Sequence, residues 1–170
     1  MNRQHLQLVE APTESLDEWA WFCGHCAVQA PEPPLPTARV CPSCGLGLFL
    51  ETRVDVLPER DDAFLVVDST LLIQAVSVHA ERLLGVTEEM VVNQPVAELV
   101  VPADAEARGS SAFAAAVADV MAADEPAQAY VRPWNTFGVR MRARIGACGP
   151  PRAALVVLEA APRSLRLVKA

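Results

Sequence analysis

Four cysteines grouped in two C-x-x-C pairs constrain the fold of this chain more than any other feature. Cys23 and Cys26 form the first pair, and Cys41 and Cys44 form the second after a fourteen-residue loop. Two residues between cysteines let one tight turn direct both sulfur atoms at a single ion, and two such turns complete a tetrahedral four-thiolate site. Because four thiolates leave no open position for water, the pattern predicts a structural metal site rather than a catalytic one.

The second pair carries a more specific signal, since it reads Cys-Pro-Ser-Cys-Gly. Pro42 pre-sets the turn, and Gly45 can take the positive φ that lets backbone amides face the sulfur atoms. Residues 20–52 therefore resemble the zinc ribbon family. The resemblance implies a structural Zn(2+) bound by Cys23, Cys26, Cys41 and Cys44.

Other uses of these cysteines remain as alternatives. Rubredoxins bind iron through similar pairs, and an iron site would make the chain an electron carrier. Ala27 stands where the rubredoxin pattern carries a glycine, which favours zinc. A thioredoxin-like redox site would need one C-x-x-C on a βαβ pattern instead of two pairs. We expect His25, inside the first pair, to be a solvent-facing spacer and not a ligand.

Charge and composition limit the choice of partner. The net charge is −7 and the pI is near 4.9, which argues against nucleic acid because binding a polyanion needs a basic surface. The sequence has no apolar run long enough to span a bilayer and no secretory pattern, so we expect a cytoplasmic protein without a membrane partner.

The second half of the chain shows the pattern of an α+β domain. Residues 63–68 and 71–76 predict a hairpin, and a short helix follows between Ser77 as N-cap and Gly85 as C-cap. Thr87 is expected to begin another short helix. The remaining expected elements are a long helix at 104–124 and strands at 128–134, 137–147 and 153–160.

The stretch AFLVVDSTLLIQAVSVHAERLLGVTEEMVVNQPVAELVVPAD is similar to the opening of a PAS domain, and the resemblance covers about residues 60–160. It implies a five-stranded antiparallel sheet with helices on one face and a small core cavity. Two positions depart from the family: Ser77 replaces a frequent asparagine, and Asn93, which can adopt a left-handed backbone, replaces a glycine. We therefore divide the chain into an N-terminal segment (1–19), a zinc ribbon (20–57), a PAS-like domain (58–161) and a C-terminal tail (162–170).

Little in the sequence predicts chemistry in the PAS-like domain. The photoadduct motif of flavin-binding members is missing, so Cys148 is expected to be a plain small residue or a surface thiol. The predicted long helix has no histidine to ligate haem, and His79 is expected to be an exposed helical residue. We therefore expect no enzyme activity. A haem- or flavin-binding sensor stays an alternative, and the ligand of the cavity is unknown.

A row of arginines is the candidate partner surface. Arg140, Arg142 and Arg144 alternate on one predicted strand, with Arg132 on a neighbour, so all four are expected on the outer face of the sheet. Such a patch could attract an acidic partner, although cross-strand pairing with acids would also explain it. The sequence thus predicts a non-catalytic signalling or regulatory protein that binds a protein partner, and a second copy in a homodimer is one candidate for that partner.

Overall fold

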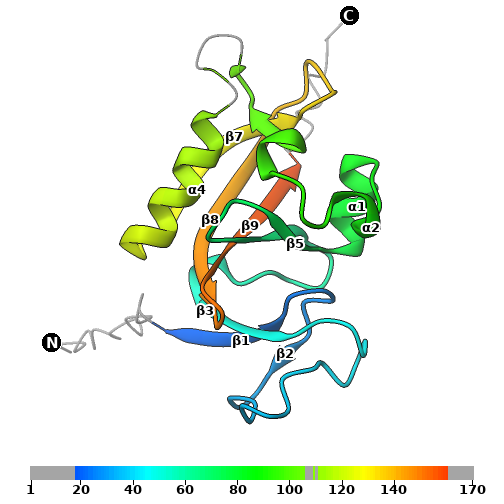
Figure 1. The fold of residues 1–170 in the computed structure, drawn as a ribbon, viewed down its shortest axis with the longest axis vertical. Coiled ribbons are helices and arrows are strands. Elements are labelled where there is room, and N and C mark those ends of the chain that lie inside the picture. Colours follow the sequence, from blue (N-terminus) through cyan, green and yellow to red (C-terminus); the bar gives the residue numbers. More distant parts are fainter. Residues whose placement is uncertain (1–17, 106–108, 110, 161–170) are drawn as a thin grey trace, which may run out of the picture.

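A computed structural model describes residues 18–105, 109 and 111–160 of the chain. One twisted antiparallel sheet runs through these residues, with helices gathered on one side of it (Figure 1). The strands are β1 (Trp19–Cys23), β2 (Gln29–Ala30), β3 (Phe49–Arg53), β4 (Ala63–Asp68), β5 (Ile73–Val76), β6 (Val100–Pro102), β7 (Ala127–Pro133), β8 (Met141–Gly149) and β9 (Ala153–Ala160). The helices are η1 (Val54–Val56), α1 (Val78–Leu84), α2 (Glu88–Val91), η2 (Val96–Glu98) and α4 (Ala112–Ala123).

The strand order is β2-β1-β3-β8-β9-β4-β5, while β7 pairs with another part of β8 and β6 pairs with β7. Strands β4, β5, β7, β8 and β9 form the predicted five-stranded antiparallel sheet, so the α+β class is confirmed. We call residues 19–53, which hold β1 to β3, the ribbon. The ribbon joins this sheet because β3 pairs with the end of β8, with Glu51 opposite Gly149 and Thr52 opposite Cys148.

The inner face of the sheet lies under the helices. Alternation along β4 directs Leu65 and Val67 to this side, where Phe113 and Val117 of α4 meet them in one apolar cluster. The space that the family resemblance assigns to a small cavity is lined by buried aliphatic and aromatic side chains.

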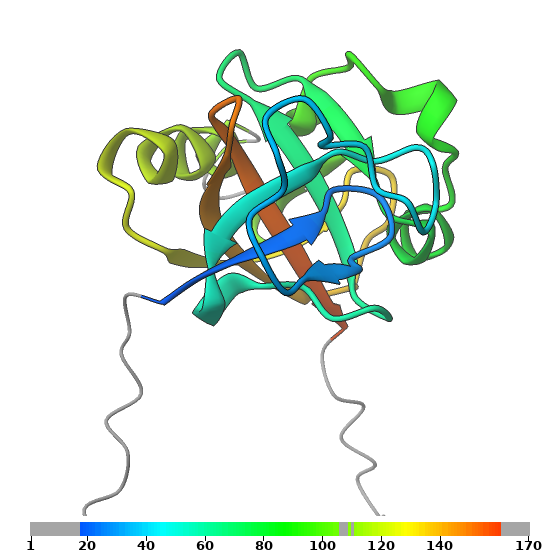
Figure 2. The same ribbon diagram turned by 90° about the horizontal axis from the view of Figure 1, so that it is seen from below.

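The outer face is covered as well, and here the covering element is the ribbon. Phe64 and Val66 of β4 point to this side and pack with Phe22 and Leu50 of the ribbon. The rings of Phe22 and Phe64 meet edge to face with their centroids 6.1 Å apart. Seen from below, β1 and β3 cross in front of β9 (Figure 2). The ribbon thus forms a second layer over part of the sheet.

Several local predictions are confirmed. The Ser77 hydroxyl accepts a hydrogen bond from the amide of Ala80 as the N-cap of α1, and Gly85 ends the helix at φ 69°. Asn93 adopts the left-handed conformation at φ 64°. Thr87 precedes α2, although its side chain makes no cap hydrogen bond.

Two predicted elements differ in extent from the observed ones. The helix expected at 104–124 is interrupted: Ala105 is helical and its carbonyl accepts a hydrogen bond from the amide of Gly109, but Gly109 takes φ 84° and α4 begins only at Ala112. Part of this prediction, residues 106–108 and 110, lies outside the described residues. The strand expected from Phe137 begins at Met141, because Gly138 takes a positive φ and the chain loops out. Phe137 is therefore in the loop, and it is 75% exposed.

Candidate metal centre

The four cysteines of the two C-x-x-C pairs converge at one point. Their sulfur atoms all lie within 4.8 Å of one another. The Sγ atoms of Cys23 and Cys44 are 3.6 Å apart, and those of Cys26 and Cys41 are 3.8 Å apart. A tetrahedral ion with metal–sulfur bonds of about 2.3 Å requires sulfur–sulfur edges of about 3.8 Å, so the cluster fits such an ion.

Two equivalent turns, the knuckles, present these sulfur atoms. The amide of Ala27 donates to the carbonyl of Cys23 in the first knuckle, and the amide of Gly45 donates to that of Cys41 in the second. Ala27 has φ 58° and Gly45 has φ 68°. Ala27 thus adopts the left-handed backbone for which rubredoxins use a glycine, so the lack of a glycine there does not separate zinc from iron.

The electrostatics of the thiols suit a metal that replaces their protons. Burial raises the pKa of Cys23 and of Cys26 above the ordinary thiol value. Burial acts in the same direction on Cys44, but the amides of Gly47 and Leu46 donate to its sulfur and lower its pKa to about 6. A bound cation would hold all four as thiolates, and its affinity would fall in acid as protons compete.

Close packing between the knuckles depends on a glycine. Gly47 follows the second pair, and a Cβ atom there would overlap the sulfur of Cys23 and the backbone of His25. The Gly47 amide also donates to the Cys44 sulfur at 3.4 Å. Gly47 therefore both closes the cluster and supplies one of its hydrogen bonds.

His25 links the first knuckle to the helices of the second half of the chain. Its Nδ1 lies 3.6 Å from a carboxylate oxygen of Glu88 in α2, and its side chain is 17% exposed. The other oxygen of Glu88 accepts a hydrogen bond from the amide of Val76. The predicted solvent-facing position of His25 is therefore wrong. Nothing in the sequence indicated this contact, because its two residues are 63 positions apart.

Arg39 makes a second link that the sequence did not indicate. It follows the proline-rich loop, whose residues are mostly exposed, and its guanidinium donates to the carbonyls of Phe49 and Pro150. The guanidinium carbon of Arg39 also lies 6.0 Å from the centre of the Trp21 ring. The loop is thereby tied to the turn between β8 and β9.

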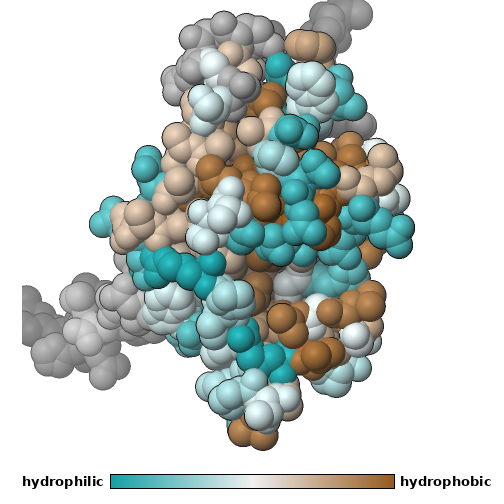
Figure 3. Space-filling view, in the orientation of Figure 1, coloured by the Kyte–Doolittle hydropathy of each residue, from teal (hydrophilic) through white to brown (hydrophobic). Residues whose placement is uncertain are grey.

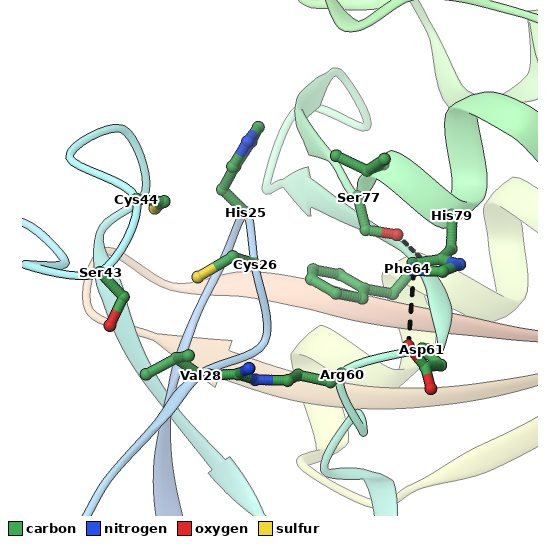
Figure 4. Close-up of a pocket in the computed structure, with 11 residues that line it drawn as sticks. His25, Cys26, Val28, Ser43, Cys44, Arg60, Asp61, Phe64, Ser77 and His79 are labelled. Atoms are coloured by element: carbon green, nitrogen blue, oxygen red, sulfur yellow. Dashed lines mark hydrogen bonds and ion pairs between the residues drawn. The ribbon is translucent and has the colours of Figure 1, made fainter.

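A hollow of about 380 Å³ separates the knuckles from β4 and α1 (Figure 4). The ring of Phe64 points into it, beside Cys26. On the far side His79 lies 3.7 Å from Asp61, and its side chain is 39% exposed, as expected of a helical histidine near the surface.

Cys148 is buried beneath the ribbon on the outer face, where burial raises its pKa to about 12.

The arginine row is only partly at the surface. Arg142 and Arg144 both donate to Glu159 of β9, at 2.6 and 2.7 Å, and Arg140 lies 4.0 Å from the centre of the Tyr130 ring. Arg132, by contrast, is 5% exposed. Its guanidinium donates to the carbonyls of Pro133, Trp134 and Thr136, because the loop after β7 folds over it. The predicted exposure of Arg132 is wrong.

The antiparallel sheet with helices on one face is the arrangement that the sequence predicted, and comparison with a known family agrees. The PAS fold family model matches residues 56–156. The match spans more than half of the chain, which therefore belongs to the PAS family, with a four-cysteine cluster near its N-terminus.

Two solved structures are similar to this chain. One is the PAS domain of nitrogen regulation protein NR(II) from Vibrio parahaemolyticus, with 15% identity, a TM-score of 0.44, and coverage of 63% of this chain and 95% of that one. The other is the PAS domain of the Cronobacter turicensis RpfR quorum-sensing receptor in complex with BDSF, with 15% identity, a TM-score of 0.45, and coverage of 62% and 99%. The comparison with curated proteins gave no match.

Proposed function

We propose that this chain is a non-catalytic, cytoplasmic signalling or regulatory protein that acts by binding a protein partner. In it, a structural zinc ion holds the ribbon as a fixed layer on the outer face of a PAS domain. The observation that carries this proposal is the position of the metal cluster, within a ribbon that packs on the sheet and hydrogen-bonds to it.

The chemistry of the cluster supports a structural role for the metal. Cys23 and Cys41 are fully buried, and four sulfur ligands complete a tetrahedral shell. Among the described residues, the ribbon's own cluster has one buried member besides Cys23 and Cys41, namely Phe49. A core of this size holds no fold by itself, so the ion would supply much of the stabilising free energy.

The surface that we assign to the partner is the part of the outer face beyond the ribbon. Arg140, Arg142 and Arg144 lie there with Tyr130, which is 54% exposed. Arginine and tyrosine are enriched at the centres of protein interfaces. Because Glu159 neutralises part of this row, Arg140 is the arginine best placed to meet an acidic group on the partner.

An iron electron carrier is the second candidate, and the backbone conformation of Ala27 supports it. The left-handed conformation at that position gives both knuckles the geometry that rubredoxin-type sites use. The distances between the sulfur atoms suit either metal. The identity of the metal therefore separates the two functions.

A haem- or flavin-based sensor is less well supported. In the described residues, Phe113, Met121 and Met141 fill the space under the helices together with aliphatic side chains. Cys148 lies on the opposite face of the sheet, and His79 contacts Asp61 instead of the core.

Metal analysis with a visible spectrum, on protein purified without added metal, tests this proposal. We expect one zinc per chain and a colourless sample. Iron with thiolate absorption bands would contradict the proposal and indicate an electron carrier. Haem or flavin bands would also contradict it and indicate a cofactor-based sensor.

Partner capture from a cell extract tests the assigned surface. We expect Arg140→Glu to reduce capture of a specific partner, whereas the matched variant Arg60→Glu, on another exposed part of the chain, should not. Equal capture of the partner by both variants would show that the arginine surface does not bind it.

A further inference from the structure

A groove of about 870 Å³ lies between the ribbon and the PAS domain, on the part of the outer face that the ribbon leaves open. Its floor is formed by Val66, Ala75 and Ala153. One wall is the ribbon, with Gly24 and His25 of the first knuckle and residues 46–48 just after the second, and the other is α2 with the turn that follows it. Its volume lies within the range of about 300–1,000 Å³ that is usual for ligand sites.

The wall on the ribbon side is apolar and exposed. Leu46 is 72% exposed and Leu48 is 45% exposed, on either side of Gly47. In the space-filling view, apolar surface gathers over the ribbon below the level of α1 and α2 (Figure 3). Large apolar side chains that the fold leaves in water beside a groove are typical of a contact surface.

The opposite wall is acidic. Glu88 and Glu89 of α2 and Asp68 at the end of β4 all line the groove. The single arginine among the lining residues, Arg152, donates its guanidinium to the carbonyl of Met121, in the direction of α4. The groove therefore favours an occupant that combines apolar side chains with positive charge.

One segment of this chain outside the described residues has that chemistry. Residues 161–170 contain Leu165, Leu167 and Val168 together with three basic residues, and they contain no acid. Residues 1–17, by contrast, hold three acids and one arginine. Charge complementarity thus selects the C-terminal segment over the N-terminal one.

The direction of β9 favours a second copy as the donor of this segment. Ala153, at the start of β9, lines the groove, and Ala160 ends the strand seven residues further on. At about 3.3 Å per residue, the segment therefore starts about 23 Å away. To return to the groove of its own chain it would have to cover the same distance again in extended form.

We propose that residues 161–170 of a second copy bind in this groove, with their leucines against Leu46 and Leu48 and their basic residues facing Glu89. This binding of one copy's segment by another rests on the proposed function in one respect, because the metal-held ribbon supplies the apolar wall. It yields a homodimer when two chains exchange segments reciprocally.

Sedimentation equilibrium of the full, metal-loaded chain tests this proposal. We expect a concentration-dependent dimer. Leu46→Asp in the groove and Leu167→Asp in the segment should each raise the dissociation constant by at least about tenfold, because either change places a charge in an apolar contact. Metal content, measured on the same samples, should stay constant, which separates this test from that of the metal.

Charge exchange provides a second test of the same pairing. Glu89→Arg and Arg166→Glu should each weaken the dimer, and the double variant should recover most of the loss. Glu32→Arg, an exposed change of the same kind in the proline-rich loop, serves as the control and should leave association unchanged. A wild-type chain that stays monomeric, or a dimer that ignores the groove and segment variants, would overturn the proposal.

Discussion

The two faces of the PAS sheet are covered by different means. Helices cover the inner face, and a large continuous cluster of buried apolar side chains holds them there. The ribbon covers part of the outer face through a smaller cluster, a short strand pairing and a site for a metal ion. The inner layer can therefore rely on hydrophobic burial, whereas we propose that the outer layer depends on a bound metal ion as well.

The junction between ribbon and sheet shows how the outer layer is fixed. Thr52 is fully buried, and its hydroxyl donates to the carbonyl of Ala147 at 2.9 Å. Val56, in the turn after the ribbon, packs against Gly146 so closely that a Cβ atom at Gly146 would overlap it. These contacts orient the ribbon, but they involve few residues.

Removing one metal ligand is expected to have the largest effect on this comparison. Cys41→Ser should abolish stoichiometric metal binding and unfold the ribbon, because structural zinc contributes about 10–16 kcal/mol in small zinc domains. Thermal unfolding monitored by circular dichroism should then show the PAS domain alone. Cys148→Ala is the matched control, and it should keep one metal per chain. A Cys41→Ser chain that retained the metal would contradict the assignment of ligands.

Phenylalanine truncations compare the two faces directly. Phe113→Ala on the inner side and Phe22→Ala on the outer side each empty a buried site, and each should cost about 3–5 kcal/mol of unfolding free energy in the metal-loaded protein. After chelation the cost of Phe22→Ala should nearly vanish, while that of Phe113→Ala should persist. Denaturant titration measures both. Equal costs before and after chelation would mean that the outer layer does not need the metal.

Gly47→Ala probes the fit between the knuckles. The added methyl group meets the Cys23 sulfur and His25, so we expect a loss of about 1–3 kcal/mol, typical of overpacking, and weaker metal binding. Competition with a chromophoric chelator measures the affinity. At Gly45 no atom lies within 4 Å of an added Cβ atom, so Gly45→Ala should cost only the strain of an alanine at positive φ. Unchanged affinity in Gly47→Ala would show that the knuckles have room to separate.

The smallest expected effect is a dependence of stability on pH. The hydrogen bond from Arg142 lowers the pKa of Glu159 below its ordinary value. Partial burial acts against this shift, and the hydrogen bond from Arg144 adds to it. The folded state therefore binds this proton less readily than the unfolded state. The resulting stabilisation is complete above the ordinary glutamate pKa and is lost as the pH falls through the lowered one.

Urea titrations across the acidic range measure this contribution, which should be small because the ion pairs are partly exposed. Glu159→Gln should remove that part of the pH dependence, whereas Glu32→Gln should not. A Glu159→Gln chain with the same acid sensitivity as wild type would show that Glu159 does not contribute.

The predictions from sequence succeeded where the signal was local. The spacing of Cys23, Cys26, Cys41 and Cys44 anticipated one cluster, and the caps at Ser77 and Gly85 anticipated the ends of α1. In each case neighbouring residues determine the geometry, so one stretch of sequence contains the information.

Long-range packing could not be anticipated in the same way. Alternation along a strand assigned Arg132 to the outer face, but it could not show that the following loop would fold over this residue. The pairing of Thr52 with Cys148 joins positions nearly one hundred residues apart, and neither residue carries a signal for it. The ribbon was therefore expected as a separate module, and its place on the sheet came only from the structure.

The reactivity of Cys148 tests most directly whether the metal holds the ribbon on the sheet. This thiol is 5% exposed and lies in the apolar cluster under the ribbon, outside the metal cluster. Alkylation with iodoacetamide, followed by mass spectrometry of the Cys148 peptide, compares the metal-loaded protein with the chelated one. We predict protection with the metal and rapid labelling after its removal. Equal labelling in both states would contradict the account.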